Sequence, residues 1–345
     1  MVAKRFRNAV VIGKFYPPHR GHHLLIGEAL AQAEEVYVLV CHKPEQAIPG
    51  PLRAAWLREV HPAAKVLEVD DTLGDDDTRG WADFTMRFLG FAPEAVFSSE
   101  DYGPRFAAAM GSVHVSVDRE RKHVPCSGTM IRGDPLACFD YLEPCVRAWF
   151  TRRVCLVGAE STGKTTLAEA LAERYDAPWM PEYGREYCEL KYGKTPFSPE
   201  CAGGAAASGE PDNWSSEEFL EIALEHARRE DLMARSCRGL LIVDTDAFAT
   251  SVWHERYLRC QGEAVEALAR ERQPLYSLYL LCDTDIPWVQ DGSRDGESIR
   301  DDMQRRFIEK LSRTGRPWIR VTGSLGERIR RGVEAISEYT GIQAP

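Results

Sequence analysis

The stretch Val154–Leu167, VCLVGAESTGKTTL, decides the fold of the part of the chain around it. An apolar run leads into a turn that fits the G-x-x-x-x-G-K-[ST] phosphate loop. Its glycines let backbone N–H groups face a polyphosphate, while Lys164 reaches the outer phosphates and Thr165 ligates Mg²⁺. The alternative is a tight strand-to-helix turn of another α/β domain. We expect nucleotide contacts from Gly158, Glu160, Ser161, Thr162, Gly163, Lys164, Thr165 and Thr166.

The place of this loop in the chain predicts two domains. A phosphate loop normally follows the first strand of its domain, yet this one lies near the middle of 345 residues. Since a typical domain has about 100–200 residues, the chain is long enough for two. We therefore expect an α/β protein with parallel sheets in both parts, a Rossmann-like domain over residues 1–147 and a P-loop domain over 148–345.

Composition restricts the class of partner. The chain has 43 Lys and Arg against 53 Asp and Glu, a formal charge of −10, which argues against general attraction to DNA or anionic membranes. No apolar run approaches the about 18 residues of a membrane span, and the first residues lack the pattern of a secretion signal. The ten cysteines are scattered without a C-x-x-C pair, so we expect reduced thiols in a cytoplasmic protein.

A second phosphate site is indicated near the start of the chain. Ala9–Ile12 has the pattern of a buried parallel strand, and helical spacing begins near Leu24. Between them lie His19 and His22, one turn apart at the expected start of the helix, where two imidazoles can meet the phosphates of a nucleotide. The alternative is that both are ordinary histidines of a solvated loop.

The histidines belong to a longer pattern. Residues 13–22, GKFYPPHRGH, match G-x-F-x-P-x-H-x-G-H and resemble the nucleotidyltransferases related to class I aminoacyl-tRNA synthetases. That family has a second motif, I-S-x-T-x-I-R, and this chain has CSGTMIR at 126–132, with Cys126 in place of isoleucine or valine, a modest apolar exchange. The resemblance implies an ATP site made of Gly13, Lys14, Phe15, His19, His22, Ser127, Thr129 and Arg132.

Three further stretches resemble the nicotinamide mononucleotide adenylyltransferase branch of that family. They are DDTLGDDDTRGWADF around Trp81, FSSEDYG at 97–103 and VDRERKHVPCSGTMIR from Val117. The resemblance implies that Trp81 stacks on the nicotinamide ring, although an aromatic core anchor is the alternative. The acidic run at 75–77 is read as a solvated loop rather than a metal site. The residues implied near the mononucleotide are Trp81, Ser98, Ser99 and Glu100.

The second half resembles the ribosylnicotinamide kinase domain of NadR-type proteins in three places. These are EYGRE at 182–186, DTD at 244–246, and Trp288 with the following D-G-x-R. The resemblance implies Glu182 as general base, with Asp244 and Asp246 as rivals, one for metal and one for ribose. As an alternative, an acid at this strand end can cap the next helix. The residues implied at nicotinamide riboside are Glu182, Tyr183, Arg185, Asp246, Trp288, Asp291 and Arg294, and those at Mg²⁺ are Thr165 and Asp244.

A lid is expected after Trp288. Its arginines are Arg294, Arg300, Arg305 and Arg306, of which one or two could reach the phosphates while the others lie on the lid surface. Trp288 or Tyr183 could hold the cationic pyridinium by a cation–π contact.

Together the resemblances imply NAD salvage in two ATP-dependent steps. Nicotinamide riboside would become nicotinamide mononucleotide in the second half, and the first half would convert it to NAD and diphosphate. The catalytic residues implied are His19, His22, Lys164, Glu182 and Asp244, with Mg²⁺ as cofactor. About eight residues precede the first strand, too few for the DNA-binding helix-turn-helix of some NadR proteins. We therefore expect neither DNA binding nor membrane insertion, and homo-oligomerisation is left open.

Two rival functions remain at this point. One is a fusion of phosphopantetheine adenylyltransferase with dephospho-coenzyme A kinase, which has the same domain order but gives no reason for EYGRE or W-x-x-D-G-x-R. The other is a nucleotide-sensing regulator in which one domain is inactive.

Overall fold

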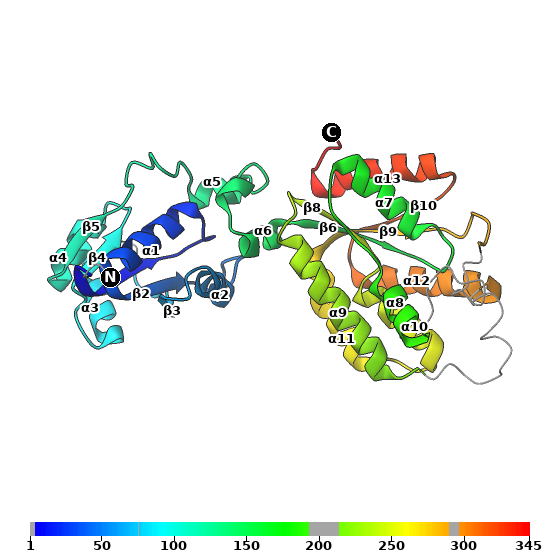
Figure 1. Ribbon diagram of the computed structural model, residues 1–345, viewed down its shortest axis with the longest axis horizontal. Coiled ribbons are helices and arrows are strands. Elements are labelled where there is room, and N and C mark those ends of the chain that lie inside the picture. Colours follow the sequence, from blue (N-terminus) through cyan, green and yellow to red (C-terminus); the bar gives the residue numbers. More distant parts are fainter. Residues whose placement is uncertain (1–3, 75, 193–213, 290–296) are drawn as a thin grey trace. The chain divides into compact units, whose positions relative to one another are not determined.

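The chain forms two compact α/β units in the computed structural model, which describes residues 4–74, 76–192, 214–289 and 297–345 (Figure 1). The first unit is Met1–Phe150 and the second is Thr151–Pro345. The division falls slightly after the expected end of the first domain at residue 147, because Val146 and Phe150 pack with Trp56 in a core cluster of the first unit.

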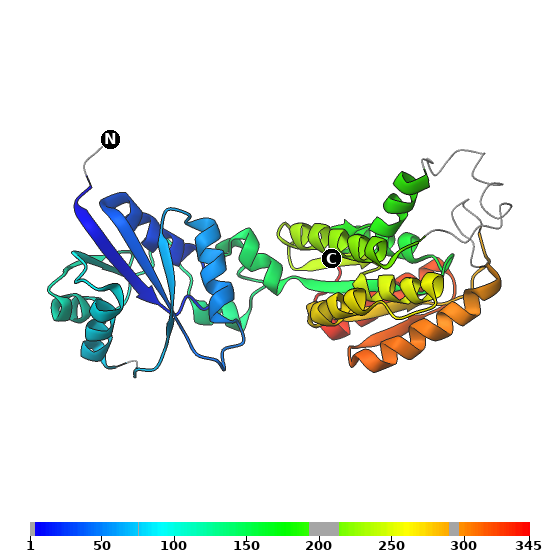
Figure 2. The same ribbon diagram turned by 90° about the horizontal axis from the view of Figure 1, so that it is seen from below.

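The first unit has a parallel sheet with the strand order β3-β2-β1-β4-β5. Successive residues of β1 point to opposite faces: Ala9 and Val11 pack with α1 and α2, whereas Val10 packs with α3 and α4. In Figure 2 the dark blue β1 runs beside β2, with which it pairs. The elements are β1 Phe6–Gly13, α1 Arg20–Gln32, β2 Ala33–His42, α2 Gly50–Val60, β3 Lys65–Asp70, α3 Thr78–Leu89, β4 Ala95–Ser98, α4 Gly103–Met110, β5 Val113–Ser116, α5 Gly128–Gly133, η1 Phe139–Tyr141 and α6 Pro144–Phe150.

The second unit has a parallel sheet with the order β10-β9-β6-β8-β7. Leu156 and Leu280 pack on one face against α7 and α13, and in Figure 1 the helices α9 to α12 lie on the other side of the sheet. The elements are β6 Arg152–Val157, α7 Lys164–Tyr175, β7 Trp179–Met180, α8 Tyr183–Tyr192, α9 Ser216–Ala234, β8 Leu240–Asp244, α10 Ala247–Leu258, α11 Glu263–Arg272, η3 Gln273–Leu275, β9 Tyr276–Cys282, η4 Glu297–Ile299, α12 Arg300–Thr314, β10 Trp318–Val321 and α13 Leu325–Thr340.

The predicted α/β class with two parallel sheets is confirmed. In both units a central strand, β1 or β6, ends in a turn that starts a helix, and parallel α/β sheets bind ligands beyond the carboxyl ends of such strands. Across the described parts of the chain, no helix is both long and apolar enough to cross a membrane. The cysteines of those parts are free thiols.

Candidate active sites

The two histidines of the first unit lie together at the start of α1. His19 caps the helix, since its Nδ1 accepts from the backbone N–H of Gly21 at 3.2 Å. A Cβ on Gly21 would lie 3.0 Å from the His19 ring, so this contact leaves little room for a larger residue. The rings of His19 and His22 are in contact, with centroids 3.7 Å apart and planes inclined by 32°. The predicted pair of imidazoles at a helix N-terminus is therefore present.

Both imidazoles are neutral near pH 7. Burial, with Arg121 as a second cause, lowers the pKa of His19 to about 4. Burial and the neighbouring His19 hold the pKa of His22 well below its ordinary value. Neutral imidazoles can donate one hydrogen bond to a phosphate oxygen without the cost of burying a fixed charge.

Cys126 contacts this pair, which sequence reasoning missed. Its Sγ lies 3.3 Å from Nδ1 of His19, the same atom that accepts from Gly21. An Nδ1 that accepts hydrogen bonds leaves the ring proton on Nε2, so the contact selects the Nε2–H form of His19. Burial raises the pKa of the Cys126 thiol, which keeps its proton available for donation. The only sign in the sequence was the departure from isoleucine or valine.

The second motif of this unit folds back onto the first. Ser127 caps α5 by accepting from the N–H of Met130 at 3.1 Å. Arg132 donates to the carbonyl of Tyr16 at 2.5 Å and to Oγ1 of Thr129 at 3.1 Å. The start of α5 lies so close to the backbone of Tyr16 that it requires Gly128, because a Cβ there would lie 2.6 Å from the Tyr16 carbonyl oxygen. The two predicted motifs are thus parts of one site.

A cavity of about 470 Å³ opens beside these motifs. Ser98 and His19 are not among its lining residues; Ser98 is buried and its hydroxyl lies 2.9 Å from Nε2 of His114. Trp81 lines it while donating from Nε1 to the carbonyl of Gly74 at 3.2 Å, so the ring is held as a wall of the cavity. The predicted residues that line it are Gly13, Lys14, Phe15, His22, Trp81, Ser99, Glu100, Ser127, Thr129 and Arg132.

Two charged residues of this cavity were not predicted. Asp71, directly after β3, has a side chain only 1% exposed, and Lys14 and Lys43 lie 3.8 and 4.0 Å from its Oδ2. Arg121 also lines the cavity and pairs with Glu100 at 3.2 Å. Neither residue belongs to a recognisable motif, since each reaches the cavity through the folding of a loop after a strand.

The phosphate loop of the second unit has the backbone that its glycines allow. Gly158, Ser161 and Gly163 have φ values of +141°, +57° and +74°, and Gly163 caps α7. A Cβ on Gly158 would lie 2.6 Å from the carbonyl oxygen of Cys282. The Lys164 ammonium donates to the carbonyls of Gly158 and Ala159 at 3.2 and 2.9 Å, so it lies over the loop. Thr166, by contrast, is exposed.

A carboxylate meets the loop at the end of β8. Oγ1 of Thr165 donates to Oδ2 of Asp244 at 2.5 Å, while Oδ1 of Asp244 is buried without a hydrogen-bond partner in the described parts of the chain. Burial, followed by the charge of Glu182, raises the pKa of Asp244 to about 6. A hydroxyl beside a carboxylate oxygen without a partner fits a hard divalent cation that takes its remaining ligands from phosphate and water.

Comparisons with known proteins show the family of the chain. The family described as AAA domain matches residues 153–328, which is just over half of the chain. The "Trifunctional NAD biosynthesis/regulator protein NadR" of Escherichia coli (strain K12) is 27% identical over 97% of this chain and 83% of its own length. The protein of the same name from Salmonella typhimurium gives the same figures. The chain belongs to the AAA domain family and is of the NadR type.

Solved structures share this fold over nearly the whole NadR-type chain. A crystal structure of NadR protein in complex with NR has a TM-score of 0.75 and 21% identity, covering 98% of this chain and 97% of its own. A second, of NadR protein in complex with NAD and AMP-PNP, has a TM-score of 0.72 and 21% identity, covering 99% and 98%. Both units therefore have the arrangement of strands and helices found in those structures.

The other acids predicted in the second unit of this NadR-type chain differ in their contacts. Asp246 caps α10: its Oδ1 accepts from Ala249 at 3.0 Å and its Oδ2 from the Tyr279 hydroxyl at 2.8 Å. Burial raises its pKa to about 7. The residue that caps the helix after this strand is thus Asp246 and not Asp244. Glu182 follows β7, half-buried and close enough to Asp244 to affect its pKa.

The remaining predicted riboside residues lie in different settings. Tyr183 is buried, and the Arg229 guanidinium lies 4.3 Å from the centre of its ring. Arg185 and Trp288 are half-buried, and Arg300 lies 5.9 Å from the Trp288 ring. Asp291 and Arg294 lie outside the described residues.

Of the arginines expected on a lid, the three in the described residues contact protein groups. Arg300 donates to the carbonyls of Glu160 and Ser161 in the phosphate loop at 3.2 and 2.8 Å. Arg305 and Arg306 bond Asp302 of their own helix at 3.3 and 3.0 Å. A direct phosphate contact by any of them stays a prediction.

Proposed function

We propose that this chain makes NAD by two ATP-dependent steps. The second unit would transfer the γ-phosphoryl group of ATP to nicotinamide riboside, giving nicotinamide mononucleotide and ADP. The first unit would then join that mononucleotide to the AMP part of a second ATP, giving NAD and diphosphate. One NadR-type chain holds both a phosphate loop whose Thr165 contacts the buried Asp244 and a helix capped by His19 against which the second motif is docked, and this observation carries the proposal.

In the kinase step the protein mainly positions and neutralises charge. Lys164 and the N–H groups of the loop would bind the outer phosphates. Thr165 and Asp244 would hold Mg²⁺, which supplies charge neutralisation between the phosphates; the buried, unpartnered Oδ1 of Asp244 supports this assignment. Glu182 is our first choice to accept the proton of the riboside hydroxyl, because both oxygens of Asp246 already accept hydrogen bonds inside the protein.

In the adenylyltransferase step no covalent enzyme intermediate is needed. His22 would donate to the α-phosphate as charge grows there, and His19, held as its Nε2–H form, would meet the outer phosphates. Lys14, Ser127, Thr129 and Arg132 would hold the departing diphosphate, and Arg121, at the same cavity, would add positive charge. Trp81 would stack on the nicotinamide ring from the cavity wall.

The experiment that tests the proposal supplies the purified chain with ATP, Mg²⁺ and one acceptor at a time. Nicotinamide riboside should give the mononucleotide and then NAD, and nicotinamide mononucleotide should give NAD directly. Transfer to dephospho-coenzyme A in place of the riboside would select the coenzyme A fusion. Binding of nucleotides with turnover of only one acceptor would select a regulator with one inactive domain. That the enzyme is cytoplasmic and does not bind DNA stays a prediction.

A further inference from the structure

Three consecutive carbonyl groups of the phosphate loop each accept a hydrogen bond from a guanidinium group. Arg300 donates through Nε to Glu160 and through Nη2 to Ser161, at 3.2 and 2.8 Å. Arg328 donates through Nη1 to Thr162 at 2.6 Å. When a loop turns its N–H groups toward a phosphate, the carbonyls of the same peptides need partners elsewhere. Here two arginines provide them.

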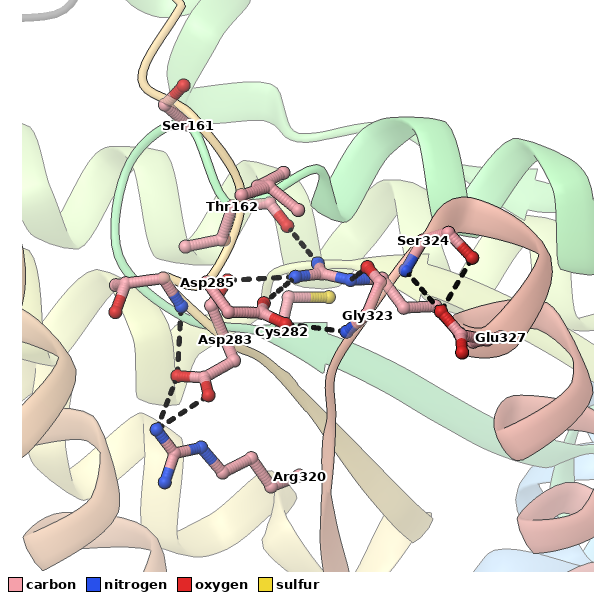
Figure 3. Close-up of polar contacts among 12 residues, drawn as sticks. Ser161, Thr162, Cys282, Asp283, Asp285, Arg320, Gly323, Ser324 and Glu327 are labelled. Carbon is pink, nitrogen blue, oxygen red and sulfur yellow. Dashed lines mark hydrogen bonds and ion pairs between the residues drawn. The ribbon is translucent and has the colours of Figure 1, made fainter.

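Arg328 is the more firmly held of the two. It is only 2% exposed, and Nε donates to the carbonyl of Gly323 at 3.0 Å while Nη2 donates to that of Asp283 at 3.1 Å. Nη2 also pairs with the carboxylate of Asp285. Thr162, Asp283, Asp285 and Gly323 come from the phosphate loop, the end of β9 and the turn before α13, and they converge in Figure 3.

The partners of Arg328 are themselves fixed. Asp285 accepts from the N–H of Gly323 at 2.5 Å, and Asp283 pairs with Arg320 at 2.6 Å (Figure 3). Gln304 adds a second link between β9 and the loop, accepting from the N–H of Ala159 at 3.1 Å and donating to the carbonyl of Cys282 at 3.0 Å. The back of the phosphate loop is therefore bonded to groups whose own positions are determined by the sheet.

We propose that Arg328 and Arg300 are positioning residues that hold the phosphate loop in its nucleotide-binding shape from behind, and that Arg300 has this role in place of the direct phosphate contact considered for it above. Each guanidinium bond fixes a peptide plane and polarises its N–H side. A loop held in this way loses less conformational entropy when ATP binds, which strengthens binding. This inference rests on the proposal that the loop binds ATP.

Arg328 acts on the phosphate loop through the planar geometry of its guanidinium group rather than through its net charge. Its ion pair with Asp285 cancels most of its long-range field. A lysine would keep the positive charge, but its single ammonium cannot reach the carbonyls of Thr162, Asp283 and Gly323 with the planar geometry of a guanidinium. Arg328→Lys therefore separates the two contributions.

The test measures both reactions of the full-length chain in Arg328→Lys, with Arg331→Lys as the matched control. Arg331 lies on the same helix, is half-exposed and pairs only with Glu334 among the ion pairs described. For Arg328→Lys we expect the KM for ATP in riboside phosphorylation to rise about tenfold, with kcat and the KM for riboside little changed. The KM for ATP in NAD formation from the mononucleotide should stay at the wild-type value. Equal KM values for ATP in the two variants, or a fall in kcat with no change in KM, would overturn the proposal.

A second variant tests the proposal even where Arg328→Lys does not fold. Arg300→Lys changes a residue of α12 rather than α13. It should raise the same KM by a smaller factor, because Glu160 and Ser161, whose carbonyls Arg300 bonds, are less buried than Thr162. The shift in thermal unfolding caused by ATP and Mg²⁺ is measured for each variant with no acceptor present. If the wild type binds ATP but does not phosphorylate the riboside, the function proposed above fails while this shift still tests the arginines. A wild-type shift in Arg328→Lys would refute their role.

Discussion

The two candidate phosphate sites differ in the groups that they place at the start of a helix. In both, a helix starts after a central strand, but α1 is capped by the His19 side chain and α7 by the backbone of Gly163. Burial keeps the histidines neutral, whereas the phosphate loop carries the Lys164 ammonium and brings Thr165 into contact with the carboxylate of Asp244. A neutral donor can stabilise the charge that develops on an inner phosphate, while a lysine, together with the divalent ion proposed at Asp244, would neutralise the higher charge of the outer phosphates.

The charged side chains around the two sites also differ in what they contact. In the first unit, Asp71 pairs with Lys14 and Lys43 at the cavity itself. In the second, Arg300 and Arg328 are directed to the carbonyl side of the loop. Within the described residues no group of three or more His, Cys, Asp or Glu side chains is arranged to hold a metal. We predict that a divalent ion at Thr165 and Asp244 takes its remaining ligands from the nucleotide and water.

The largest expected effect comes from Lys164→Ala. It removes the side-chain cation of the loop, so phosphorylation of nicotinamide riboside should fall by about 10³-fold or more. NAD formation from nicotinamide mononucleotide should keep its wild-type rate, because the two sites belong to separate units. Product analysis of each half-reaction measures this, and loss of both reactions would break the comparison.

His22→Ala is the reciprocal change. Loss of the donor at the inner phosphate should lower NAD formation from the mononucleotide by about 10²-fold to 10³-fold, mostly in kcat. Riboside phosphorylation serves as the control and should be unaffected. Retention of full adenylyltransferase activity would mean that His22 does not take part in that reaction.

The two reactions should differ in their dependence on pH. Metal binding needs the ionised carboxylate of Asp244, whose pKa burial raises to about 6, so the kinase rate should fall as pH drops through this value. Extra Mg²⁺ should move that fall to lower pH, since the cation favours the carboxylate form. His19 stays neutral until its pKa of about 4, so the adenylyltransferase rate should hold over the same interval. Coincident acid limbs in the two pH–rate profiles would contradict this contrast.

The smallest effect is expected for Cys126→Val. The change restores the aliphatic residue of the resembling family and removes the thiol at Nδ1 of His19, while the Gly21 N–H remains. NAD formation should fall about fivefold, and ring ¹⁵N shifts of His19 should show a larger share of the Nδ1–H form. Cys237→Val, at a buried thiol of the second unit, is the control. An unchanged tautomer population would assign the thiol to packing alone.

Most of the fold could be predicted because its information is local. A phosphate loop consists of consecutive residues between a strand and a helix, so the apolar run before it and the helical spacing after it indicated β6 and α7. The apolar run Ala9–Ile12 and the helical spacing from Leu24 did the same for β1 and α1. The midpoint location of the loop then implied a second sheet. Asp244 was indicated as well, since a carboxylate at the end of a buried strand lies at the ligand-binding edge.

The sequence by itself thus determined the two nucleotide motifs, the α/β class and the order of the units. The tertiary structure alone decided which distant side chains surround those motifs: Cys126 on His19, Asp71 between two lysines, Asp246 as a helix cap and Arg328 behind the loop. The physical reason is that motifs act through backbone that is continuous in the chain. The partners of that backbone depend on strand order and register, which bring Thr162 and Arg328 together across 166 positions of the sequence.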